Sequence, residues 1–285
     1  MMRIRRALAT ILGLTAGLAA GPALAEGAGK TKTWRHGAIT VTAHIREPAE
    51  KDGDRVVVSV RGRTVASFHF TEFNRLGNVF IAEMDPANGY PEVIVEEYTG
   101  GAHCCTQIWV VRAPAKWSRG RWRALDLGGF DGGDFKPRDL DGDGLAELKL
   151  HDGAFLYLYS SYVGSYPPPK ILSVRHGKVV DLTRKASMRP ILRREEARMR
   201  KWIAEAEKEK GEINGFLAGY VALKLLLGEG VEGWRLMLGK HRPTRIDYCP
   251  LPGPGNTDGC PVPVLKLPYP AHLLITLREL GYIKS

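Results

Sequence analysis

The sequence predicts a mainly antiparallel β domain over residues 36–183, followed by an α-helical region over residues 187–285. Many short runs between residues 36 and 183 alternate polar and apolar side chains with a period of two. Gly-rich turns separate these runs, and no helical periodicity intervenes. After Thr183 the apolar spacing changes to the i, i+3, i+4 pattern of amphipathic helices.

Residues 1–25 are predicted to be a secretory signal peptide. Residues 1–6 are basic, residues 7–20 are small and apolar, and Ala23-Leu24-Ala25 is an A-x-A cleavage site. The apolar run is too short and too rich in Ala and Gly for a stable membrane span, and no later stretch is long enough. We therefore expect a mature chain without a transmembrane segment, in the periplasm or outside the cell, where disulfides persist.

The length and charge of the chain set broad limits on its class. Its 285 residues suffice for one large or two ordinary domains. The formal net charge is +10, and three of these positive charges come from arginines in the predicted leader. A positive balance suits an anionic partner such as polysaccharide, lipid headgroups or nucleic acid, but we favour an ordinary basic surface. We expect a protein or polysaccharide partner in the cell envelope and no nucleic acid.

The β part is expected to consist of about ten short strands. Residues 26–35 are polar and are expected to be loose. The runs with strand-like alternation or strand-forming composition are residues 39–45, 56–60, 64–70, 79–84, 92–98, 106–111, 122–127, 147–150, 155–159, 171–174 and 179–182.

Four helices are expected in the second part. Residues 189–210 are charged and favour helix, with a possible buried stripe of Ile191, Met199, Trp202, Ile203 and Ala206. The strongest helical pattern starts at Ile213 and ends at the glycines 228 and 230, with Lys224 interrupting its apolar stripe. A short helix around residues 231–238 and a last helix from Pro270 to Gly281 follow. The Pro- and Gly-rich residues 243–270 between them hold two cysteines.

The acidic turn at residues 139–147 has the pattern of a calcium loop. Asp139, Asp141, Asp143 and Glu147 occupy positions 1, 3, 5 and 9 of the turn, and Gly144 occupies position 6. Oxygen ligands at alternate residues, with a glycine that permits a sharp turn, suit Ca²⁺. An EF-hand would need a Glu at position 12, which is Leu150 here, and would continue into a helix rather than a strand.

The pattern D-x-D-x-D-G-x-x-[DE] ahead of a strand resembles the calcium loops of FG-GAP (VCBS-like) repeats, the blades of integrin-type β-propellers. The resemblance covers roughly residues 76–183. It implies Asp139, Asp141, Asp143 and Glu147 as side-chain ligands of Ca²⁺ and Leu145 as a backbone carbonyl ligand. The strands suffice for two to three blades, whereas closed propellers have about four to eight. A partial, propeller-like arrangement or a two-sheet repeat is therefore expected.

Residues 84–95 are a weak internal repeat of residues 139–150. Each copy is a polar turn with a central glycine, followed by a Glu three residues later that enters an apolar strand. The two glycines, Gly89 and Gly144, are 55 residues apart, a spacing that suits one four-stranded blade. The first copy lacks two of the carboxylates, so we interpret it as an ordinary hairpin turn.

The segment His103-Cys104-Cys105 and the pair Cys249 and Cys260 permit three disulfide connectivities. We favour Cys249–Cys260 with Cys104–Cys105, because the first pair closes a short local loop. A disulfide between the two segments is the next alternative. Binding of copper or zinc by His103 and the two thiols is a weaker alternative.

The sequence lacks the G-x-S-x-G, P-loop, H-E-x-x-H and Rossmann motifs. We therefore expect a secreted or periplasmic, non-catalytic, calcium-binding structural or interaction module. One alternative is a periplasmic hydrolase that acts on an envelope polymer. The other is a protein that handles thiols or metals through His103, Cys104 and Cys105.

Overall fold

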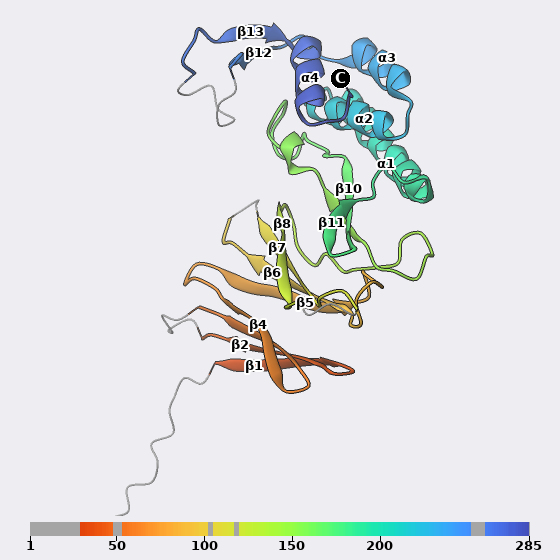
Figure 1. The fold of residues 1–285 in the computed structure, drawn as a ribbon. Helices are drawn as coiled ribbons and strands as arrows, with labels where there is room; N and C mark the ends of the chain where they lie inside the picture. Colours follow the sequence, from red (N-terminus) through yellow and green to blue (C-terminus); the bar gives the residue numbers. More distant parts are fainter. Residues whose placement is uncertain (1–28, 48–52, 102–104, 117–119, 252–259, 285) are drawn as a thin grey trace, which may run out of the picture.

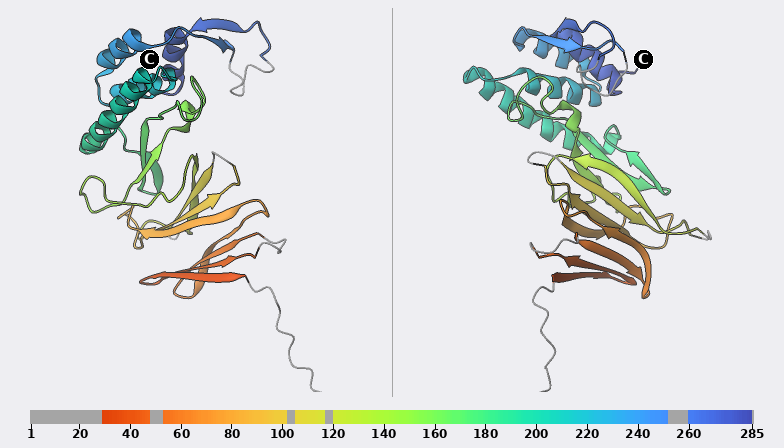
Figure 2. Two further views of the ribbon diagram at one scale, coloured as in Figure 1. Left: turned by 180° about the vertical axis from the view of Figure 1, so that it is seen from behind. Right: turned by 90° about the vertical axis from the view of Figure 1, so that its left-hand side faces the viewer.

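The computed structural model describes residues 29–47, 53–101, 105–116, 120–251 and 260–284. Antiparallel sheets come first along the chain and helices follow, as the sequence predicted (Figure 1). The sheets are stacked along the long axis of the molecule, and the helices lie at the end far from β1 (Figure 2). The predicted signal peptide, residues 1–25, lies outside the described residues.

The first two sheets are simple meanders, in which each strand pairs with the next one in the chain. The first sheet contains β1 (Lys30–His36), β2 (Ile39–Ile45), β3 (Arg55–Val60) and β4 (Arg63–His69). The second contains β5 (Arg75–Ala82), β6 (Glu92–Tyr98), β7 (Thr106–Arg112) and β8 (Arg123–Phe130).

Strand β6 shows how the sheets are held together. Successive side chains of a strand point to opposite faces of the sheet. Val93 and Val95 pack against the valines of the first sheet, whereas Ile94 packs against Leu148 and Leu150 on the other side. All of these side chains are buried. The second sheet is thus buried on both faces, which explains the continuous apolar run in β6.

The third sheet has the order β11-β10-β9 and leads into the helices. Its strands are β9 (Leu148–His151), β10 (Pro169–Arg175) and β11 (Lys178–Asp181). The single turn η1 (Gly153–Phe155) follows β9, and η2 (Ala186–Met188) precedes the first long helix. Ile171, Met188 and Ile191 form a small core where the third sheet meets that helix.

The helical part has its own core. The helices are α1 (Arg189–Lys208), α2 (Asn214–Leu226), α3 (Gly230–Lys240) and α4 (Tyr269–Glu279). Met199 and Ile203 of α1 pack with Leu217 and Tyr220 of α2, and Leu273 of α4 completes the cluster. None of the helices in the described part of the chain is long and apolar enough to cross a membrane.

Glycine allows the segment between β9 and β10 to approach α2 closely. A Cβ atom at Gly219 would lie 1.8 Å from the carbonyl oxygen of Tyr166, and one at Gly215 would lie 2.4 Å from that of Gly164. Real Cβ atoms do not tolerate such distances, so α2 needs glycine at both positions to contact this segment.

Two expectations about the strands were wrong. Residues 30–36 form β1 rather than a loose segment, because their backbone pairs with β2 although their side chains are largely exposed. Residues 155–159 are not a strand. Asp152 accepts a hydrogen bond from the backbone N–H of Ala154 and starts η1, and Tyr157 has a φ of 59°, which a strand does not permit.

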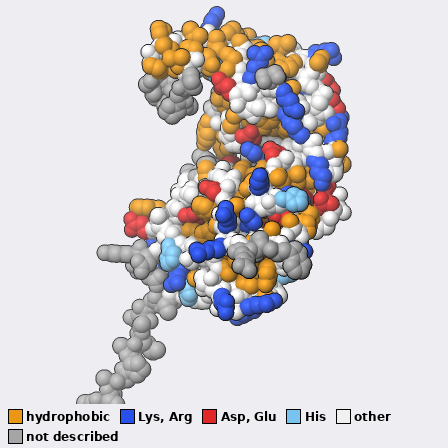
Figure 3. Space-filling model, in the orientation of Figure 1, with side chains coloured by type: hydrophobic (Ala, Val, Ile, Leu, Met, Phe, Trp, Pro, Cys, Tyr) orange, Lys and Arg blue, Asp and Glu red, His pale blue; other side chains and the backbone are white. Residues whose placement is uncertain are grey.

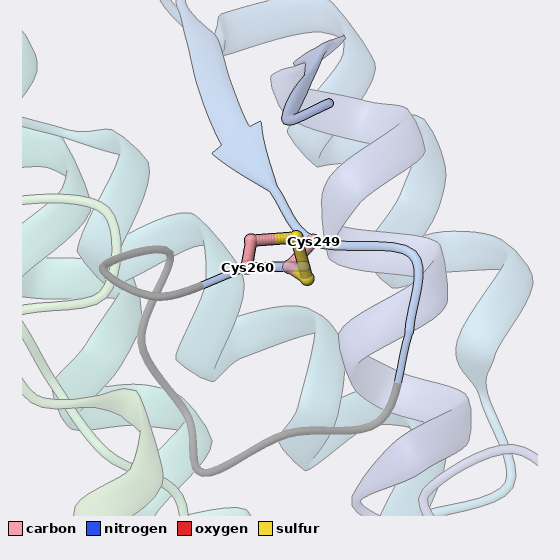
Figure 4. Close-up of a disulfide and its surroundings, with 2 residues drawn as sticks. All are labelled: Cys249 and Cys260. Carbon is pink, nitrogen blue, oxygen red and sulfur yellow. A yellow bond between two sulfur atoms is a disulfide. The ribbon is translucent and has the colours of Figure 1, made fainter. Parts of the chain in front are cut away.

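Residues 243–270 contain an unexpected hairpin of β12 (Arg245–Tyr248) and β13 (Leu265–Pro268). It extends sideways from the helical part, beside α4 (Figure 1). The favoured disulfide between Cys249 and Cys260 is present at its end (Figure 4). The favoured Cys104–Cys105 pair and the His103 alternative involve residues outside the described part of the chain.

The predicted buried stripe of α1 is correct except at Trp202. Ile191, Met199, Ile203 and Ala206 are buried, whereas Trp202 is 53% exposed. The Trp202 ring stacks on the ring of Phe216, with 6.3 Å between the centroids. Partial cover by one neighbouring ring is enough for an aromatic side chain at the edge of the core.

Candidate metal centre

The acidic turn connects the second and third sheets and closes as a hairpin. Arg138 and Glu147 form an antiparallel bridge, in which each backbone N–H donates to the other residue's carbonyl oxygen at 3.0 and 2.8 Å. The segment between β8 and β9 runs out beneath α1 (Figures 1 and 2). The acidic turn therefore lies at the junction of the β and helical parts.

The first aspartate shapes the turn. The two carboxylate oxygens of Asp139 accept hydrogen bonds from the backbone N–H groups of Gly142 and Gly144, at 2.7 and 3.0 Å. Both glycines have a positive φ, 80° and 84°, which side chains with a Cβ rarely adopt. The sharp turn expected at Gly144 is thus present.

Three of the four predicted carboxylate ligands converge. One oxygen from each of Asp139, Asp141 and Glu147 lies within 4.8 Å of the others. Glu147 is fully buried, and the Asp141 side chain is 1% exposed. Such a group has the oxygen donors and the spacing that a hard cation such as Ca²⁺ requires.

The other two predicted ligands lie differently. Asp143 does not belong to the convergent group: one of its oxygens accepts from the backbone N–H of Leu145 at 2.9 Å, and the other faces Lys185 at 3.3 Å. Leu145 is half-buried at the edge of the turn.

Asp141 is the least satisfied of the acids. Its Oδ2 accepts hydrogen bonds from Lys185 Nζ at 2.8 Å and from Ser187 Oγ at 2.6 Å. These hydrogen bonds lower the pKa of Asp141. Its Oδ1 is buried and has no hydrogen-bond partner among the described residues. A buried carboxylate oxygen without a donor is costly, and a cation would satisfy it.

Glu147 is held from two sides. Its Oε2 accepts from the backbone N–H of Leu140 at 3.0 Å, and its Oε1 lies 2.6 Å from the Arg175 guanidinium. Burial raises the pKa of Glu147, although both contacts act in the opposite direction.

Arg175 connects the acidic turn with its predicted repeat. Besides Glu147, its guanidinium donates to the carbonyl oxygen of Met84, at the start of the first copy. The backbone N–H of Ala146 also donates to the carbonyl oxygen of Glu83, at 2.7 Å. The two turns therefore lie side by side, an arrangement that the sequence pattern did not reveal.

The turn at residues 84–95, the first copy of the repeat, is held by one carboxylate and has no cluster of aspartates. Glu92 is fully buried and accepts from the backbone N–H groups of Met84 and Asp85, at 2.8 and 3.0 Å. It also accepts from the Asn88 side chain at 2.6 Å. Burial raises the pKa of Glu92 to about 7. Internal donors thus satisfy this turn.

Sequence reasoning missed the side chains that donate to these carboxylates. Arg175 is the last residue of β10, and Lys185 and Ser187 lie in the segment before α1, between 28 and 46 positions from their partners. Nothing in their local sequence distinguishes them from other polar residues on the surface. Only the packing of the third sheet beside the acidic turn brings them there.

The fold and the site define a class of protein in which stacked antiparallel sheets are followed by a C-terminal helical region, with an acidic turn at their junction. Residues 192–281 match the sll0997 C-terminal domain family. The chain is 37% identical over 239 residues to the probable thylakoid lumen protein sll0997 of Synechocystis sp. (strain ATCC 27184 / PCC 6803 / Kazusa), an alignment that covers 81% of this chain and 68% of that protein. The chain belongs to the sll0997 family.

A second relative is the uncharacterized protein y4bJ of Sinorhizobium fredii (strain NBRC 101917 / NGR234). It is 30% identical over 212 residues, which cover 74% of this chain but 33% of y4bJ. No solved structure matches the chain.

Proposed function

We propose that the chain is a non-catalytic calcium-binding module, structural or interactive, of a periplasmic or lumenal compartment, and that its acidic turn is the site. The observation that carries the proposal is the buried Oδ1 of Asp141, which has no hydrogen-bond partner in the part of the chain that the structure describes and lies in a group with Asp139 and Glu147. The resemblance to FG-GAP calcium loops supports the calcium-binding function, and the name of the relative, probable thylakoid lumen protein sll0997, supports a lumenal or periplasmic compartment.

The charges near the turn suit a divalent cation. Four carboxylates, from Asp139, Asp141, Asp143 and Glu147, face two cationic side chains, from Arg175 and Lys185. The remaining charge is two negative units, which one Ca²⁺ ion would neutralise.

The position of the turn indicates what the ion would do. Leu140 packs against the small core that contains Met188 and Ile191, and Asp141 contacts Lys185 and Ser187 just before α1. A cation at Asp139, Asp141 and Glu147 would hold the turn rigid against the start of the helical part. Binding to the folded state alone would stabilise it by about 2.7 kcal/mol at a calcium concentration one hundred times the dissociation constant.

The test is a calorimetric titration of the full chain with CaCl₂, together with thermal melting in calcium and in chelator. We expect one saturable site and a higher melting temperature in calcium. Asp141→Asn should abolish both effects, whereas Asp143→Asn should weaken them less. Asp247→Asn, on the β12–β13 hairpin, is the remote control. The absence of heat and of a melting shift for the unsubstituted chain would refute the proposal.

A second candidate function, hydrolysis of an envelope polymer, has one observation in its favour. A cavity of about 480 Å³ lies beside β8 and η1 and is lined by His151, Asp131, Asp152 and Lys170, among others. Burial lowers the pKa of His151 and so favours the neutral imidazole, the form that accepts a proton. If soluble envelope glycans or peptides are cleaved by the chain but not by His151→Gln, this candidate replaces the non-catalytic one.

A further inference from the structure

A second polar cavity lies between the acidic turn and α1. It has a volume of about 310 Å³, at the lower end of the range for small-molecule sites. Three elements supply its walls: the segment before the acidic turn, strand β9 and the first half of α1. Ile191, Arg194 and Arg198 of α1 line it because residues three and four apart share one helix face.

The lining of this cavity is strongly cationic. Five basic side chains, from Lys136, Arg138, Lys149, Arg194 and Arg198, stand against two acidic ones, from Asp134 and Glu195. Helix α1 and neighbouring surface also display Lys and Arg in the space-filling view (Figure 3). The excess of three positive charges within one concave site calls for an anion.

The one buried acid in the cavity is already neutralised. Glu195 is 2% exposed and forms ion pairs with Lys149 and, at 3.2 Å, with Arg198. Its other carboxylate oxygen accepts a hydrogen bond from Tyr166 at 3.1 Å. Both carboxylate oxygens of Glu195 are therefore engaged, one by Lys149 and Arg198 and the other by Tyr166.

Three cations of the lining form no ion pair within the described part of the chain: Lys136, Arg138 and Arg194. Arg138 comes from the segment before the acidic turn and Arg194 from α1, so two different elements each supply one guanidinium group to the cavity. Guanidinium groups bind phosphate through paired, charge-assisted hydrogen bonds. A phosphate dianion matches the excess charge better than a single carboxylate does.

We propose that this cavity binds a phosphate monoester of a small molecule, through Arg138, Arg194 and Lys136. The cavity borders the calcium turn, because Leu140 lines it, but none of the three convergent carboxylates does so. Its ligand would contact the cations of α1 and of the segment before Asp139, whereas the calcium site uses the carboxylates of Asp139, Asp141 and Glu147. The size of the cavity leaves room for a sugar-sized group beside the phosphate.

The experiment is a calorimetric titration of the full chain with glucose 6-phosphate in chelator-containing buffer, so that calcium plays no part. We expect saturable binding of one molecule, weaker binding at higher NaCl, and none of unphosphorylated glucose. Arg194→Gln should weaken binding about tenfold or more, because it removes a charged donor. Lys201→Gln, an exposed cation on α1 outside the cavity, is the matched control and should change affinity less than twofold.

Three results would overturn the phosphate assignment. They are no binding of glucose 6-phosphate, equal losses in Arg194→Gln and Lys201→Gln, and equal affinity for citrate. Vesicles of phosphatidic acid in phosphatidylcholine test whether the phosphate belongs to a lipid. If the chain binds these vesicles but does not bind glucose 6-phosphate, a small-molecule ligand is also refuted. Unchanged melting and unchanged calcium titration of Arg194→Gln show that the variant folds and that the two sites are separable.

Discussion

The ammonium group of Lys185 lies 2.8 Å from Oδ2 of Asp141 and 3.3 Å from Oδ2 of Asp143. Lys185 thus supplies one positive charge to an acidic turn from a segment far along the chain. The same side chain would compete with a metal ion for the oxygen of Asp141. Its exposure of 42% limits the strength of this pair.

Lys185→Gln should therefore raise the affinity for Ca²⁺. Removal of a partly exposed ion pair corresponds to about 0.2–1 kcal/mol, which is at most about a fivefold increase in calcium affinity. In chelator the same variant should melt at a lower temperature, because the carboxylates then repel one another with less compensation. Calorimetry and thermal melting check both effects. Weaker calcium binding by the variant would show that Lys185 supports the site instead of competing for it.

Glu92 should make stability depend on pH. Its pKa rises from 4.5 to about 7 on folding, because it is buried. Between these values the unfolded chain has lost the proton while the folded chain retains it, so stability falls as pH rises and is constant above about pH 7. Each pKa unit corresponds to about 1.4 kcal/mol, and the shift of Glu92 from 4.5 to about 7 therefore predicts a total loss of about 3–4 kcal/mol.

Glu92→Gln removes this titration, so the unfolding free energy of the unsubstituted protein minus that of the variant should fall as pH rises from 4.5 to about 7. Urea denaturation at a series of pH values between 4.5 and 8 measures the difference. Parallel pH profiles for both proteins would mean that the hydrogen bonds from Met84, Asp85 and Asn88 keep Glu92 ionised.

Lys224 should be essential for the stability of the helical part. It is 1% exposed, and its ammonium contacts Glu196 at 3.0 Å, Glu232 at 2.9 Å and Glu229. Lys224→Met would leave these acids without their shared cation, and removal of one partner from a buried pair costs about 3–5 kcal/mol. Lys201→Met, on an exposed position of α1, should change the unfolding free energy by less than about 0.5 kcal/mol. Similar losses in the two variants would contradict this role.

The disulfide between Cys249 and Cys260 should stabilise the β12–β13 hairpin. It joins residues 11 positions apart (Figure 4). Closing a loop of this size in the unfolded chain stabilises the folded state by about 2–3 kcal/mol. The double substitution of both cysteines by serine should lower the unfolding free energy by that amount and therefore lower the denaturation midpoint. An unchanged midpoint would indicate that the pairing of β12 with β13 suffices.

Local periodicity was enough to predict the order of the elements. The apolar alternation of residues 39–45 and 92–98 anticipated β2 and β6, and the helical spacing after Thr183 anticipated α1, α2, α3 and α4. These features depend on which face of a segment is buried, and that information is present in neighbouring residues. The strand β1 and the β12–β13 hairpin were missed because backbone pairing holds them, with little burial of their side chains.

By itself the sequence determined the mainly-β and then helical class, and the spacing of carboxylates and glycines in the turn at residues 139–147. Only the tertiary structure decided that Asp143 lies outside the group of Asp139, Asp141 and Glu147. It also decided that Arg175 pairs with Glu147 and that Lys185 pairs with Asp141. The same holds for Lys224, a break in an apolar stripe that becomes a buried ionic centre once α1 and α3 supply its acids. The physical reason is that charges interact through space, so the partners of a charged group depend on packing and not on distance along the chain.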